Sequence, residues 1–208
     1  MRSLLPAAVA PLLLAAAANA AIVGTTGMAT YLSTPPPSAL PGALTGLTLY
    51  CWDEAVNAPT GGVLMQMSVN PSTVLNNIGA TPAPAPAFVN SHFLHLEGPV
   101  PAMVLGTITF DAPILGVIYD DVPLDITDGP LGNASTFYPT SFPQRGWNGF
   151  RMISINGPVL TFELQPGINN GGPLEQLRVV TAVPAPGPVA LAGLGSLLML
   201  RRRRAKAE

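Results

Sequence analysis

The stretch FVNSHFLHL, at residues 88–96, decides the fold class, because it has the composition of a β-strand and is bounded by proline and glycine. Seven further runs of this kind, rich in β-branched and aromatic residues, occur at residues 44–50, 62–69, 103–110, 114–119, 151–155, 159–164 and 176–181. Turn sequences such as Asn156-Gly157-Pro158 separate them. Strands at this spacing, with almost no helix between them, predict an all-β domain over residues 21–182, folded as an antiparallel β-sandwich or jelly roll.

Composition favours the same class. The chain of 208 residues contains 24 prolines and 21 glycines, and only 10% of its residues are charged. This is unusual for a cytosolic domain and typical of loop-rich extracellular β structure. The proline-rich segments at residues 34–41 and 81–87 are expected to form exposed, extended loops within the domain.

The charge of residues 21–182 excludes one class of partner. This part of the chain holds ten acidic residues and three arginines, and therefore has a formal net charge of −7. A domain with so few cations cannot neutralise a phosphate backbone, so we expect no nucleic-acid binding.

The first 20 residues have the pattern of a secretory signal peptide. Arg2 supplies the positive charge, residues 4–18 form an apolar segment, and Ala18-Asn19-Ala20 is a small-x-small cleavage site. We predict that this N-terminal helix is removed by signal peptidase after Ala20 and that the rest of the chain is exported.

The C-terminal tail has three parts: a proline-rich motif at 183–187, an apolar segment at 188–200 and a basic end at 201–208. The prolines keep the motif extended. The uncharged run at 189–200 would reach about 18 Å as a helix, against roughly 30 Å of hydrocarbon, so it is a marginal membrane helix suited to temporary anchoring. The basic cluster would stop transfer and keep this end cytoplasmic; it consists of Arg201, Arg202, Arg203 and Arg204.

This order of motif, short apolar helix and arginine cluster resembles the PEP-CTERM sorting signal of Gram-negative bacteria. The family resemblance implies recognition by exosortase, a membrane-embedded cysteine protease, and delivery to the cell surface or exterior. Here Val183-Pro184-Ala185-Pro186 has alanine in place of the central glutamate, so the tail is similar to the Val-Pro-x-Pro variant. The body is also similar to uncharacterised members of the family at residues 89–93, 114–117, 124–128 and 177–181, which implies a coherent domain.

The residues able to carry chemistry are few. Cys51 is the only cysteine, so an intrachain disulfide is excluded. We interpret it as a small buried side chain, and the alternative is a reactive or intermolecular thiol. His92 and His95 are the only histidines and lie three apart in a predicted strand, so their rings are expected to point to opposite faces and not to share a metal ion. We expect one ring to pack inward with a hydrogen-bond partner and the other to be solvated.

The acidic stretch at residues 120–128 is the densest group of oxygen ligands. Asp120, Asp121, Asp125 and Asp128 are a candidate calcium site in a loop, although their spacing does not match an EF-hand. The alternative is that these residues build turns and solvate a loop between strands. Calcium is the only cofactor that the sequence suggests.

Trp147 lies in QRGWNG, where glycine and asparagine predict a loop, and is therefore the candidate for an exposed glycan-stacking residue. The sequence contains no Gly-x-Ser-x-Gly elbow and no glycine-rich phosphate loop. We therefore expect a non-enzymatic surface or matrix protein with a structural or adhesion role. The alternatives are a carbohydrate-binding module for extracellular polysaccharide and, with less support, a secreted hydrolase.

Overall fold

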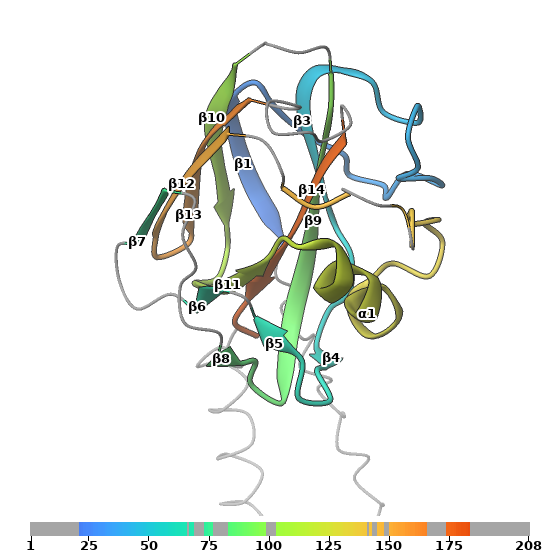
Figure 1. The fold of residues 1–208 in the computed structure, drawn as a ribbon. Helices are drawn as coiled ribbons and strands as arrows, with labels where there is room; N and C mark the ends of the chain where they lie inside the picture. Colours follow the sequence, from blue (N-terminus) through green and yellow to red (C-terminus); the bar gives the residue numbers. More distant parts are fainter. Residues whose placement is uncertain are drawn as a thin grey trace, which may run out of the picture. The chain divides into compact units, whose positions relative to one another are not determined.

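A computed structural model describes residues 21–65, 67–68, 73–76, 83–98, 103–140, 142, 145–147, 150–165 and 174–183. Residues Asn19–Val183 form one compact unit. Its elements are mostly β-strands in antiparallel pairs, which confirms the predicted all-β sandwich class (Figure 1).

Two sheets form the sandwich. The first has the order β1 (Ile22–Gly27), β10 (Val104–Phe110), β13 (Val159–Gln165), β12 (Phe150–Asn156) and β7 (Thr73–Asn76). The second has the order β2 (Ala29–Tyr31), β3 (Gly46–Asp53), β9 (Phe88–Glu97), β14 (Leu174–Thr181), β11 (Ile114–Ile118) and β6 (Met67–Ser68), with β4 (Ala58–Pro59) added beside β9. A separate short pair joins β5 (Leu64–Met65) to β8 (Ala83–Pro84).

The main core lies between the two sheets. Along β10 and β13, alternate residues such as Ile108 and Phe162 are buried, and they belong to one cluster with Leu94 of β9 and Leu177 of β14. The period of two places these apolar side chains on the inner faces. Burial of this shared face is what holds the sandwich together.

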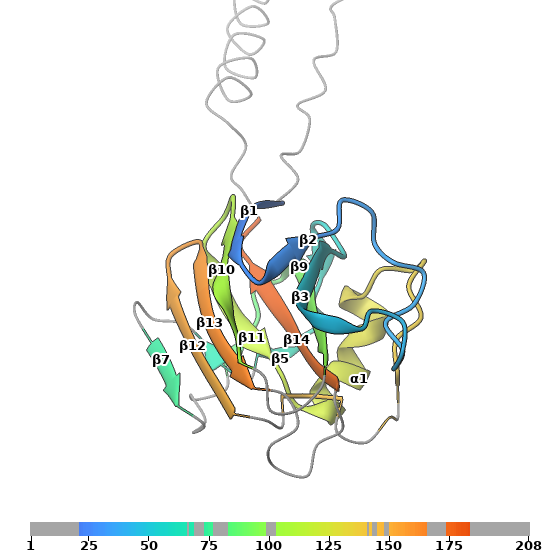
Figure 2. The same ribbon diagram turned by 90° about the horizontal axis from the view of Figure 1, so that it is seen from above.

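The single helix among the described residues, α1 (Asp121–Leu131), was not predicted. It covers the face of the second sheet that points away from the first, so the layers run sheet, sheet, helix (Figure 2). Leu124, Thr127 and Leu131 are buried at spacings of three and four, and Pro123 lies in the first turn, where its missing N–H costs no hydrogen bond. The expectation of a loop at residues 120–128 is therefore wrong.

Because the second sheet is covered on both faces, its central strands are buried throughout. All eight residues of β14 and nine of the ten residues of β9 are buried. The polar side chains of these strands that face α1 must therefore find partners inside the protein.

Candidate functional site

Charged side chains of α1 and of the segments beneath it form a cluster, which we call the buried ion cluster: Glu54, Asp125, Asp128, Arg145 and Arg178. Arg145 and Arg178 are both fully buried. Buried charges of this kind require ion pairs and hydrogen bonds to offset the loss of water.

Arg178 of β14 is held from three sides. Its Nε and Nη2 donate to the two carboxylate oxygens of Glu54 at 2.7 Å and 2.9 Å. Nη1 donates to the Thr127 hydroxyl, and Nη2 also reaches Asp128 at 3.1 Å. The helix is thereby fixed to the strand, and every end of the guanidinium has an acceptor.

Arg145 occupies the second position in the cluster. Its Nη1 lies 2.7 Å from Asp125 and 2.6 Å from Asp128, and its Nε donates to the Gln176 side chain at 3.0 Å. The two arginines thus share Asp128, and the arrangement joins α1, β14 and the segment at 145–147.

The surroundings of Arg178 and of the neighbouring Tyr138 shift the pKa of both groups upward. Burial alone would lower the pKa of Arg178, but the carboxylates of Glu54 and Asp128 outweigh it and raise the pKa further above the usual arginine value. Burial and the neighbouring Glu54 raise the pKa of Tyr138, whose hydroxyl donates to Glu54 at 2.5 Å. These contacts tie Arg178 and Tyr138 to the same Glu54 carboxylate beneath α1.

The candidate calcium residues lie in and just before α1. Asp120 is the N-cap residue, Asp121 accepts from the Gly146 N–H at 2.6 Å, and Asp125 and Asp128 bind Arg145. In the described part of the chain, no group of three or more His, Cys, Asp and Glu side chains converges on a position for a metal ion.

His92 and His95 face opposite sides of β9, as predicted. His92 pairs in register with Val179 on the sandwich side and packs against Phe110, whereas His95 faces the α1 side and bonds to Gln176. The expectation that one ring is solvated is wrong, because both are fully buried. The cause is the cover that α1 and its neighbouring loops place over the second face.

His92 lies between an acid and a hydroxyl. Its Nδ1 is 2.7 Å from Asp53 and its Nε2 is 3.0 Å from the Thr181 hydroxyl. Burial opposes ionisation of Asp53, but hydrogen bonds from His92 and Tyr31 outweigh it and lower the pKa of Asp53. The arrangement of Asp53, His92 and Thr181 resembles the acid, histidine and hydroxyl of a catalytic triad. However, Thr181 is fully buried, so no substrate reaches its hydroxyl in this conformation.

His95 is an uncharged counterpart on the other face. Burial lowers its pKa to about 4. Its Nε2 has no hydrogen-bond partner in the described part of the protein, and Glu97 lies 3.7 Å away.

Two other predicted positions are buried. Cys51 is fully buried, as expected, and burial raises its thiol pKa to about 12, so it is not a reactive thiolate. Trp147 is only 2% exposed and belongs to the main core, so the prediction that it is an exposed glycan platform is wrong. The neighbouring residue Gly146 packs closely against the start of α1, and the Trp147 N–H donates to the Tyr119 carbonyl at 2.8 Å. These contacts hold the segment at 145–147 against the domain.

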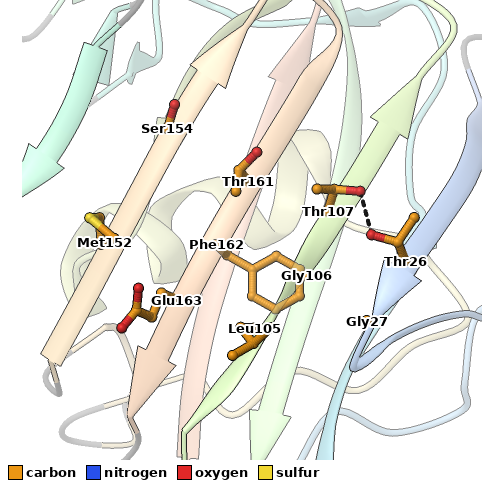
Figure 3. Close-up of a pocket in the computed structure, with 10 residues that line it drawn as sticks. All are labelled: Thr26, Gly27, Leu105, Gly106, Thr107, Met152, Ser154, Thr161, Phe162 and Glu163. Carbon is orange, nitrogen blue, oxygen red and sulfur yellow. Dashed lines mark hydrogen bonds between the residues drawn. The ribbon is translucent and has the colours of Figure 1, made fainter.

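The accessible candidate site is a groove on the outer face of the first sheet, with a volume of about 480 Å³ (Figure 3). Four hydroxyl residues line up across four strands: Thr26 pairs with Thr107, Thr107 with Thr161, and Thr161 with Ser154. The Thr26 and Thr107 hydroxyls lie 2.7 Å apart. We call these four residues the hydroxyl row.

A second row lies beside the first. Leu105, Glu163 and Met152 pair across β10, β13 and β12, and Leu105 is 54% exposed. The groove therefore offers neutral hydroxyls, one carboxylate and apolar side chains, which suits a neutral polar ligand better than an anion. Neither histidine and no member of the buried ion cluster lines it.

The predicted processing residues lie at the margins of the described part. Ala18, Ala20, Pro184, Ala185, Pro186 and the four arginines at 201–204 lie outside it, whereas Val183 is its last residue. Among the residues that the structure describes, none of the helices has the length and apolar character needed to cross a membrane.

Sequence reasoning missed Glu54, Arg145 and Arg178. A signal was present, since Arg178 stands within the apolar strand LRVVT of a chain segment with only three basic residues.

Comparison of the chain with protein-family models, curated proteins and solved structures gives no match.

Proposed function

We propose that this chain is an exported cell-surface or extracellular-matrix protein, sorted through its C-terminal tail by an exosortase-like enzyme, with a non-enzymatic structural or adhesion role. The observation that carries the proposal is the position of the two ends of the domain. The N–H of Asp111 donates to the Ala21 carbonyl at 3.0 Å, and the N–H of Ala182 donates to the Pro113 carbonyl at 3.0 Å. Both ends thus leave beside the same β10–β11 turn.

This placement suits a chain that is processed at both ends. β1 begins at Ile22 and β14 ends at Thr181, so cleavage after Ala20 and within residues 183–187 would break no strand pairing. A domain that keeps all its sheet bonds after both cuts remains folded once it is released. The buried ion pairs of Arg145 and Arg178 and the His92–Asp53 contact fit a structural role, because they hold the strands, α1 and the segment at 145–147 together.

The sorting proposal is tested by following the protein in the cells that make it. One variant lacks residues 189–208, a second carries glutamine at Arg201, Arg202, Arg203 and Arg204, and a third combines Pro184→Ala with Pro186→Ala. We expect the first two to lose the membrane-held intermediate and the third to accumulate in the membrane uncut. Surface display equal to wild type in all three would contradict the proposal.

A second candidate function, carbohydrate binding, is favoured by the groove. The volume of about 480 Å³ is in the usual range of ligand sites, and the hydroxyl row supplies donors and acceptors suited to sugar hydroxyls. A glycan array compared with Thr161→Val and Glu163→Gln tests it, with Thr48→Val, on β3 and outside the groove, as the matched control. Glycans retained by Thr48→Val and lost by the groove variants would support this function, whereas no glycan bound by wild type would remove it.

A further inference from the structure

The strands β4, β5 and β8 lie at one end of the domain (Figure 1, lower end), and apolar side chains on and beside them are exposed. Val56 is 40% exposed, Leu64 57% and Phe88 54%. We call these three residues, with the exposed prolines Pro59, Pro84 and Pro86, the apolar end. Large apolar side chains gathered in this way on a monomer indicate a contact surface.

Backbone pairing connects the segments that form the apolar end. Pro59 pairs with Phe88, and Leu64 pairs with Pro84. Two further bonds, from Thr60 N–H to Ala87 and from Ala85 N–H to Val63, close the space between the strands. These contacts fix the strands that carry Phe88 and Leu64, and Val56 lies two residues before β4.

The chain segment that carries the apolar end is also uncharged. Residues 55–91 contain no Asp, Glu, Lys or Arg. The domain as a whole is acidic, so an uncharged end is the part of its surface that approaches a lipid headgroup region at the least electrostatic cost. An acidic partner or a nucleic acid has nothing to bind here.

The tail leaves the domain at this same end. The Asn90 side chain accepts from the Asn57 N–H at 2.7 Å and donates to the Ala182 carbonyl at 3.0 Å. Asn90 thus joins the turn that carries Val56 to the last residues before the tail. Only residues 184–188 separate Val183 from the uncharged run at 189–200, a tether of about 16 Å if extended.

We propose that the apolar end rests on the lipid bilayer surface while the tail holds the chain in the membrane. The inference depends on the proposed membrane-anchored intermediate. A tether this short keeps the apolar end at high effective concentration beside the bilayer, so a weak apolar contact is enough to orient the domain. Because no charge is involved, the contact is independent of anionic lipid and of salt.

The test uses the full chain reconstituted in phosphatidylcholine vesicles, with an environment-sensitive fluorophore attached to Phe88→Cys. Phe137→Cys is the matched control, because Phe137 is 74% exposed and lies beside Ala39, whose carbonyl accepts from Gln176. Gln176 precedes Thr181 by five residues on β14, which is about 17 Å along the strand. The control position therefore lies far from the end at which the tail leaves. The buried Cys51 does not label in the folded protein.

We expect the fluorescence at position 88 to shift to the blue and to be quenched by spin-labelled lipid, and we expect neither effect at position 137. Both effects at position 88 should remain when phosphatidylglycerol is added to the vesicles. They should also remain in 0.5 M salt, where the Debye length is roughly 4 Å. Protein that floats with the vesicles while both probes stay in water overturns the inference and leaves the anchored intermediate intact. Protein that does not float contradicts the membrane step itself. A shift that needs anionic lipid, or one that depends on protein concentration without lipid, overturns it in favour of a charged contact or a second copy.

Discussion

Arg178 and Glu54 form a two-pronged ion pair, with Nε to Oε2 at 2.7 Å and Nη2 to Oε1 at 2.9 Å, although they lie 124 positions apart in the chain. Both side chains of this pair are fully buried. The pair connects the end of β3 to the middle of β14 and lies under α1. It is the centre of the buried ion cluster.

Replacing Arg178 with methionine should destabilise the domain by about 3–5 kcal/mol, because the Glu54 carboxylate would remain buried without its cation. Urea unfolding followed by circular dichroism measures the change. Arg178→Lys is the matched control, because lysine keeps the positive charge but cannot bind both carboxylate oxygens as the guanidinium does. It should lose less unfolding free energy than Arg178→Met. A loss below about 1 kcal/mol for Arg178→Met would show that the cluster does not hold α1 in place.

Trp147→Ala should cost about 3–5 kcal/mol of unfolding free energy, because the indole is in the main core. Thermal unfolding of the two proteins gives the comparison. Phe137→Ala, which removes an aromatic side chain that is 74% exposed, should change stability little. Equal melting temperatures for Trp147→Ala and wild type would place Trp147 outside the core.

Two glycine-to-alanine changes should act in opposite directions. A Cβ on Gly106 would clash with the Thr26 carbonyl oxygen and lie 2.9 Å from Phe162, so Gly106→Ala should separate β1 from β10 and destabilise the domain. Gly129→Ala in α1 meets nothing within 4 Å and should stabilise by up to about 1 kcal/mol. Chemical denaturation of both variants tests this, and destabilisation by both would contradict the position of α1.

Stability should fall as the pH is lowered from 6.5 towards 4, because His95 is buried in its neutral form. Its pKa is lowered from 6.5 to about 4, so the unfolded chain binds a proton in this window and the folded protein does not. The folded protein is therefore most stable above pH 6.5 as far as His95 is concerned, and the loss of stability on lowering the pH to 4 amounts to about 3 kcal/mol. The denaturation midpoint should fall less steeply with decreasing pH in His95→Gln than in the wild type. The same pH dependence in both proteins would show that His95 is not buried in its neutral form.

The strands could be predicted from sequence because each carries its own signal. The runs at 88–96, 103–110 and 159–164 match β9, β10 and β13 within a residue or two, since apolar composition and turn residues are local features. Five strands lie outside the predicted runs: β1, β2, β4, β7 and β8. Of these, β1 and β2 are rich in Thr, Gly and Ala and depend on pairing with β10 and β3.

The site could not be predicted in the same way. α1 contains two prolines and a glycine and has weak helical propensity, so its place is decided by Arg145 and Arg178, which are distant in sequence. Its buried positions 124, 127 and 131 follow the helical period and were the available signal. Trp147 was expected in an exposed loop, a local inference that the approach of Gly146 to α1 overrides.

We propose that two removable ends deliver this β domain to the cell exterior. Intact-mass spectrometry of the protein recovered from the surface of the cells that make it tests this proposal. The predicted mass is that of a chain beginning at Ala21 and ending within residues 183–187. A mass that includes residues 1–20, or the arginines at 201–204, on the exported protein would contradict it.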